Sequence, residues 1–179
     1  MNPKYKIDID LVFICSESVK NLKDFNNDCN NFIFNSIFWE DVFCNWLEII
    51  IQENINDKSK ILSYKKNFSL SFHIIDNKEI SILNKKWLNK KGPTDVISFP
   101  IIIEKEFEYD LLFIELGDLF ISLEQAAKQA KDFSNSLIRE MLFLASHGLL
   151  HLLGWEHDSE EKLKSMLNLQ EYLISKVDV

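Results

Sequence analysis

Residues 147–157 read HGLLHLLGWEH and hold three of the four histidines in this chain of 179 residues. His147 and His151 are four residues apart, so on a helix their rings project from the same face about one turn apart. Gly154 follows three residues later, where a glycine permits the left-handed turn that ends a helix. That turn can swing His157 back toward the other two. The stretch therefore predicts a helix that ends in a cluster of three imidazoles.

The spacing H-x-x-x-H-x-x-G-x-x-H is that of the ligand set in metzincin zinc sites. Three neutral imidazoles leave the fourth tetrahedral position open to water, whereas structural zinc sites are normally closed by four protein ligands. A single histidine on an apolar helix is usually a core residue, but three at this spacing favour a metal site over unpaired buried imidazoles. We predict that one Zn²⁺ per chain is bound by His147, His151 and His157. Another metal that prefers imidazole, such as nickel, remains open.

Residue 148 is a glycine where metallopeptidases with this spacing carry a glutamate. That glutamate takes the proton from zinc-bound water, and glycine cannot replace it. A peptidase is therefore disfavoured. Zinc still lowers the pKa of bound water toward about 7 and acts as a Lewis acid on phosphoryl oxygens, so hydrolysis of a phosphodiester remains open. The sequence does not identify a catalytic general base.

The composition, 46% apolar and 27% charged, is typical of a soluble globular protein. The length suits one domain with a substantial core and hardly suits two. Three widely spaced cysteines without a C-x-x-C pair favour a reducing compartment. Neither a signal peptide nor a membrane span is recognisable. We predict a cytoplasmic protein with no membrane partner, in which residues 1–179 form one metal-dependent hydrolase domain.

The formal net charge of −8 speaks against a nucleic-acid partner, but the charge is unevenly distributed. Residues 58–91 hold nine lysines against two acids, a local charge of about +7. The ordinary interpretation of such a segment is a solvated face. A surface that faces a polyanion also remains open, because the local field matters more than the net charge.

Hydrophobic periodicity predicts the order of helices and strands. Strands are expected at 6–14, 69–75, 95–99 and 117–123. Helices are expected at 39–55, 77–88, 122–133, 136–153 and 159–176, with loops at 21–35 and 104–110. Strands interleaved with helices and followed by a helical end indicate one layered domain of the α/β type.

The stretch SHGLLHLLGWEH (146–157) closely resembles the H-G-x-L-H-L-x-G-Y-D-H signature of the YbeY-type rRNA maturation factors. Trp155 and Glu156 stand for the usual tyrosine and aspartate. Further stretches match in the family's order, namely LNKKW…PTDVISFP (83–100), LGDLFIS (116–122), RE (139–140) and MLNLQEYLI (166–174). The resemblance covers roughly residues 69–176.

This resemblance implies an α+β fold, a single layered domain in which a small mixed sheet of about four strands packs against about five helices. The metal site is expected at the end of the long helix in the C-terminal half. The resemblance further implies a zinc-dependent endoribonuclease specific for single-stranded RNA. Its partners would be rRNA precursors and components of the small ribosomal subunit, in small-subunit RNA end processing and ribosome quality control. The family's metal ligands fall on His147, His151 and His157.

One feature of the family is missing. Members commonly carry an arginine directly after the aromatic residue of LNKKW, associated with holding the RNA phosphate, and here that position is Leu88. The only arginine in the chain is Arg139. Nearby lysines can supply charge without the bidentate fork of arginine, namely Lys85, Lys86, Lys90 and Lys91. The missing arginine and the negative net charge leave open a second function, a non-catalytic ribosome-assembly binding factor whose metal stabilises the fold.

Several polar or aromatic residues near these motifs allow two interpretations. In PTDVISFP, Asp95 can belong to the site or can only cap and pair locally. Asp118 and Glu140 can be structural or can be partners of the histidines. Trp87 fits the core by its spacing, and base stacking on it is the alternative.

Overall fold

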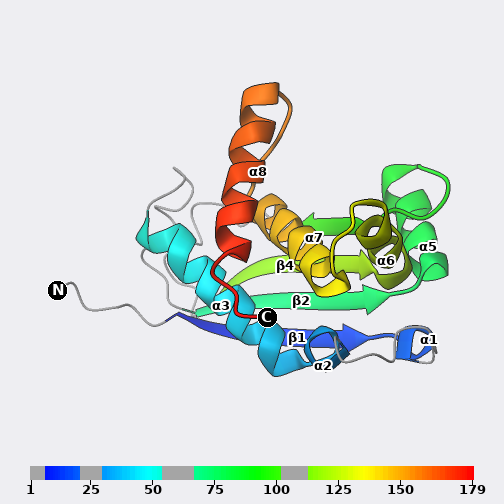
Figure 1. Cartoon of the computed structure of the whole chain (residues 1–179), viewed down its shortest axis with the longest axis horizontal. Helices are drawn as coiled ribbons and strands as arrows, with labels where there is room; N and C mark the ends of the chain where they lie inside the picture. Colours follow the sequence, from blue (N-terminus) through cyan, green and yellow to red (C-terminus); the bar gives the residue numbers. More distant parts are fainter. Residues whose placement is uncertain (1–6, 21–29, 54–66, 102–112) are drawn as a thin grey trace.

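The computed structural model describes residues 7–20, 30–53, 67–101 and 113–179 (Figure 1). Within them one sheet is formed by β1 (Asp8–Cys15), β2 (Asn67–Ile75), β3 (Val96–Pro100) and β4 (Ile114–Ser122). The strand order is β1-β2-β4-β3. Strands β1, β2 and β4 run parallel, and β3 pairs antiparallel with β4 at one edge. The mixed sheet of four strands is confirmed.

The described residues contain five helices of ten residues or more, which are α3 (Ser36–Gln52), α5 (Asn77–Leu88), α6 (Leu123–Asp132), α7 (Leu137–Leu152) and α8 (Glu160–Ile174). Two helices of four residues are α1 (Glu17–Lys20) and α2 (Asn30–Ile33). The α+β class is therefore confirmed. The predicted loop 21–35 is wrong in part, because α2 lies inside it, and the predicted loop 104–110 lies outside the described residues. Among the helices described, none is long and apolar enough to cross a membrane.

Polar side chains set where the helices begin. Helix α3 starts at Ser36, three residues before the predicted Trp39, because the Asn35 side chain accepts hydrogen bonds from two backbone N–H groups of the first turn. Helix α5 starts with a capping box, in which Asp76 and Glu79 each accept a backbone N–H of the other. Serines cap the three later helices at Ser122, Ser136 and Ser159.

The main core lies on one face of the sheet, which α3 and α7 cross (Figure 1). Trp39, Phe43 and Trp46 of α3 are fully buried in this core, and the rings of Trp39 and Phe43 pack against Phe72 of β2. Because neighbouring residues of a strand point to opposite faces, Leu119 and Ile121 of β4 meet α7 on this same face. This packing places the C-terminal end of α7, with its histidines, beside the sheet.

Helix α5 packs against a smaller apolar cluster on the opposite face. Ile80 of α5 is buried with Ile75 and Ile97, and Phe99 and Phe120 pack against them. By strand alternation, Ile97, Phe99 and Phe120 point away from the face that α7 covers. The lysine-bearing helix and the histidine-bearing helix therefore lie on different faces of the sheet.

A candidate metal centre at the end of α7

Helix α7 ends in a Schellman motif that reverses the chain after the second histidine. Gly154 has a φ of 79° and donates its N–H to the carbonyl of His151 at 2.8 Å, and Trp155 donates to the carbonyl of Leu150 at 2.9 Å. A side chain at residue 154 would strain this backbone, so glycine fits the turn. The glycine turn predicted from the spacing is confirmed, and it brings residue 157 back to the helix end.

The turn gathers His147, His151 and His157 in one place. Each offers one ring nitrogen, and these three atoms lie within 4.8 Å of one another. The Nε2 atoms of His147 and His151 are 3.1 Å apart. His147 and His151 are half-buried, whereas His157 is exposed. Together they could hold a metal ion from one side, with the exposed side left open.

The other nitrogen of each half-buried imidazole is bound to the protein. His147 Nδ1 lies 3.3 Å from Oε1 of Gln170, and His151 Nδ1 lies 2.9 Å from the carbonyl oxygen of Trp155. Both partners are acceptors, because Gln170 uses its own amide nitrogen to donate to the carbonyl of Phe143. Both Nδ1 atoms must then carry the proton, which leaves both Nε2 lone pairs free.

Two lone pairs that face each other at 3.1 Å repel unless a cation lies between them. For a tetrahedral zinc with Zn–N bonds of about 2.05 Å, the ligand nitrogens are about 3.3 Å apart. The spacing of His147 and His151 is close to that value. The three ligand nitrogens lie within 4.8 Å of one another, so the exposed His157 completes the set once its side chain moves closer. The donor atoms therefore fit a metal ion of the size and preference of Zn²⁺.

Burial favours the neutral form of the two half-buried imidazoles, those of His147 and His151. It lowers the pKa of His147, although the hydrogen bond to Gln170 opposes this effect, and it also lowers the pKa of His151 against the effect of the Trp155 carbonyl. Neutral imidazole is the form that binds metal. The two rings are therefore ready to act as ligands at neutral pH.

Gly148 lies at the contact between α7 and the sheet. A Cβ atom on this residue would come within 2.1 Å of Cδ1 of Leu119, a fully buried side chain of β4. The residue after the first histidine thus faces the core. A glutamate at this position would be driven into the sheet, which gives the absence of the peptidase base a structural reason.

The hydrogen bonds of Asp95 and Glu140 go to residues other than the histidines, although the charge of Asp95 also acts on His147. Asp95 accepts hydrogen bonds from Thr94, from the N–H of Val96 and from Gln129 of α6, so it ties the start of β3 to a helix. Glu140 accepts a hydrogen bond from Asn135. Within the described part of the chain, no hydrogen bond joins any of these carboxylates or Asp118 to a histidine. The side chain of His147 is hydrogen-bonded to Gln170 instead, and that of His151 to the Trp155 carbonyl.

Gln170 was not singled out from the sequence, although a signal was present. It is fully buried on the apolar face of α8, among Met166, Leu169 and Leu173. A glutamine on an otherwise apolar stripe needs hydrogen-bond partners. Sequence alone does not show that one of them is His147, which is 23 residues away.

Neither Arg139 nor Leu88 lies in the histidine cluster. Arg139 is paired with Glu171 of α8, with N···O distances of 2.8 and 3.0 Å. Leu88 is the last residue of α5 and is 49% exposed. Trp87 is exposed as well and contacts Phe99, with Lys86 over its ring, so it is not the core residue that its spacing favoured.

A model of the family described as Endoribonuclease YbeY matches residues 39–178. The chain belongs to the YbeY family. The match begins 30 residues before the stretch in which the resemblance was recognised, so α3 is also part of the region that the family shares.

Curated relatives with the name Endoribonuclease YbeY agree with this assignment. One from Prochlorococcus marinus subsp. pastoris is 55% identical over 174 residues, which is 97% of either chain. One from Synechococcus sp. strain CC9605 is 40% identical over 136 residues, 76% of this chain and 82% of the relative. Among solved structures, TM1509 of Thermotoga maritima matches with a TM-score of 0.53 and 20% identity, over 94% of this chain and 89% of that one. At that identity the structural match supports the fold alone.

Proposed function

We propose that this chain is a zinc-dependent endoribonuclease that cuts single-stranded RNA during ribosomal RNA maturation, notably at the ends of small-subunit RNA, and serves in ribosome quality control. One Zn²⁺ is bound by His147, His151 and His157. The partners are rRNA precursors and components of the small ribosomal subunit, in the cytoplasm. Membership of the YbeY family and the activity in the names of its relatives support the RNA substrate.

The observation that carries the proposal is that the Nε2 atoms of His147 and His151 face each other at 3.1 Å. The Nδ1 atom of each ring is hydrogen-bonded to the protein, to Gln170 in His147 and to the Trp155 carbonyl in His151. Zn²⁺ at this point supplies Lewis acidity toward a phosphoryl oxygen and an acidified water, the chemistry that phosphodiester hydrolysis needs. The protein keeps two imidazoles neutral and oriented by burial and hydrogen bonds. His157 lies on the exposed side, where a phosphodiester can approach. No residue is assigned as general base.

The test compares the wild type with His151→Ala, and with His73→Ala as the matched control. His73 is the histidine outside the cluster, half-buried on β2 against Phe120. We expect His151→Ala to lose bound zinc and to cut a single-stranded rRNA fragment at least about a hundredfold more slowly, since the partners of zinc ligands alone are worth 10–100-fold. His73→Ala should keep both properties. Normal cleavage by metal-free His151→Ala would refute the mechanism.

The same experiment separates this function from a ribosome-assembly factor with a structural metal, which the net charge of −8 and Leu88 favour. Such a factor, fully loaded with zinc, would bind the rRNA fragment without cutting it, and His151→Ala would then lose stability rather than activity. Steady hydrolysis of casein would instead support a peptidase, which Gly148 makes unfavourable.

A further inference from the structure

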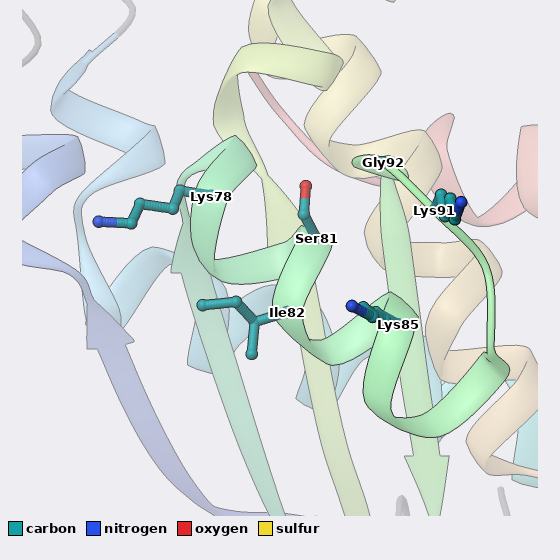
Figure 2. A pocket seen from close by; sticks show the side chains of 6 residues that line it. All are labelled: Lys78, Ser81, Ile82, Lys85, Lys91 and Gly92. Carbon is teal, nitrogen blue, oxygen red and sulfur yellow. The ribbon is translucent and has the colours of Figure 1, made fainter.

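A hollow of about 440 Å³ lies between the solvent-facing side of α5 and the turn that follows this helix (Figure 2). It is lined by Lys78, Ser81, Ile82, Lys85, Lys91 and Gly92. None of the clustered histidines is among these residues. The hollow is therefore separate from the candidate metal centre.

One buried side chain fixes the turn that forms the far side of the hollow. Asn84 is only 4% exposed, and its Nδ2 donates a hydrogen bond to the carbonyl of Gly92 at 2.9 Å. Its backbone carbonyl accepts the N–H of Lys90 at 3.3 Å. The turn is thus tied to α5 before any ligand arrives. The backbone that carries Lys91 is thereby positioned beside α5, which lowers the entropic cost of ordering this turn on binding.

The hollow is a local cationic surface on an acidic protein. Residues 77–92 contain five lysines and one acid, Glu79, whose carboxylate is already bound to the backbone N–H of Asp76. Among the described residues, the ion pairs are Lys20–Glu17, Arg139–Glu171 and Lys162–Asp158. The three lysines that line the hollow are in none of these pairs. Lys78 also acts on the charge of Asp76 at the start of α5, and Lys85 and Lys91 have no such partner among the described residues.

We propose that this hollow binds the phosphate backbone of the RNA substrate, outside the metal centre. This inference rests on the proposed endoribonuclease function. Ammonium groups bind phosphate oxygens as point charges, without the geometric demands of arginine. Ile82, which is 59% exposed, adds apolar surface for a ribose or a base. The surface thus offers the positive charge with which proteins track the backbone of single-stranded nucleic acid without reading its sequence.

The spread of the charges favours a polymer over a small phosphate ligand. Lys78 and Lys85 are seven residues apart, which is about 10 Å along a helix axis. Figure 2 shows the ammonium groups of Lys78 and Lys91 pointing away from each other rather than toward one point. One phosphate cannot contact all three lysines. An RNA strand, which has a phosphate at every nucleotide, can contact all three lysines.

The test replaces Lys78, Lys85 and Lys91 together by glutamine. The changes are made in the His151→Ala background, so that the RNA stays intact while binding is measured. The probe is a fluorescein-labelled oligouridylate of roughly 16 nucleotides. We expect the affinity at about 0.1 M salt to fall roughly tenfold, and the slope of log affinity against log salt to shrink by about 2, since each phosphate contact to a single strand contributes about 0.7.

The matched control carries the same loss of charge elsewhere, as Lys128→Gln, Lys164→Gln and Lys176→Gln, three exposed lysines that do not line the hollow. It should change the affinity by no more than about twofold. Arginine at the three hollow positions should preserve binding, because the charge is kept.

Three results would overturn the proposal. They are unchanged affinity in the hollow variant, equal loss in the control variant, and uridine monophosphate competing as strongly as the oligomer. If the protein with intact histidines binds and cuts RNA while the hollow variant binds normally, only this inference fails. If the intact protein neither binds nor cuts RNA, the proposed function fails together with it.

Discussion

In the half-buried His147 and His151, the two ring nitrogens have different roles. The Nδ1 atoms of His147 and His151 are bound to the protein, and the Nε2 atoms face each other. For His151 the partner is a backbone carbonyl that the helix-ending turn supplies. For His147 it is Gln170, a side chain of another helix. Metal affinity should therefore depend on a residue that cannot itself contact the ion.

Replacing Gln170 by methionine keeps the volume of the side chain and removes the acceptor for His147. The imidazole is then free to change tautomer and to rotate, so zinc affinity should fall about 10–100-fold. Competition with a chromogenic chelator measures this change. Ser146→Ala is the control, because it removes another neighbour of the Gln170 amide and leaves the contact with His147. Equal zinc affinity in Gln170→Met and the wild type would contradict the assigned role.

Glu140 is a carboxylate with only 4% of its surface exposed. Burial raises its pKa above the ordinary value of 4.5, and the hydrogen bond from Asn135 offsets this effect only in part. Its contribution to stability is thus fully present below pH 4.5 and is lost as the pH rises through the pKa of the folded state.

We therefore expect Glu140→Gln to raise Tm relative to the wild type at pH 7, with the difference vanishing toward pH 4. Glutamine retains an oxygen that can accept the Asn135 hydrogen bond. Thermal unfolding of metal-free protein across this pH range measures the effect. A Tm difference that is the same at both ends of the range would show that ionisation of Glu140 is not its cause.

The histidine cluster was predictable from the sequence because its geometry is local. A four-residue spacing on a helix and a glycine turn bring His147, His151 and His157 together without any distant contact. The roles of Gln170 and Asn84 were not predictable in the same way. The bond of Gln170 to His147 spans 23 residues, and it depends on how α8 packs on α7.

At the level of elements, α7 packs on β4, and the two backbones approach closely at Gly148. Gly148 has no side chain, and Leu119 fills the space that a Cβ would take. The close packing of α7 on β4 at Gly148 sets the position of His147, the residue before it. Any side chain at residue 148 must therefore displace either Leu119 or the helix that carries two of the three histidines.

Gly148→Ala should lower the free energy of unfolding modestly, because overpacking costs about 1–3 kcal/mol and alanine regains about 1 kcal/mol of helix propensity. Gly148→Glu should cost several kcal/mol more, because a charge is then buried without a partner. Urea unfolding of the metal-free proteins measures both. Adding Leu119→Ala should recover part of the loss in Gly148→Glu. A stable Gly148→Glu single variant would mean that α7 can move away from the sheet.

Most element positions followed from local patterns, and the exceptions have physical reasons. Periodicity located the four strands and the long helices to within a few residues, because burial on one face imposes it. The order β1-β2-β4-β3 did not follow from periodicity, since β2 and β4 pair although β3 lies between them in the chain. The short α2 was missed, since four residues contain too little pattern to distinguish a helix from a loop.

For the whole molecule, metal binding should be measurable as stability. An ion that binds only the folded chain stabilises it by about 2.7 kcal/mol when present at about 100 times its Kd. For a chain of this size, that should raise Tm by roughly 5–10 °C. Thermal unfolding with zinc and with EDTA measures the difference. His151→Ala should show almost no difference, and a full zinc-dependent rise in that variant would place the ion elsewhere.

The tight contact between Gly148 and Leu119 also bears on how this protein can evolve. Acquiring a zinc-peptidase base requires a glutamate beside the first histidine, and here that one substitution first damages the core. The change in chemistry therefore depends on a second change, in which Leu119 of β4 moves or is replaced by a smaller residue. The ligand spacing is shared with peptidases, but the packing of Gly148 on Leu119 makes the peptidase glutamate a two-step change for this chain.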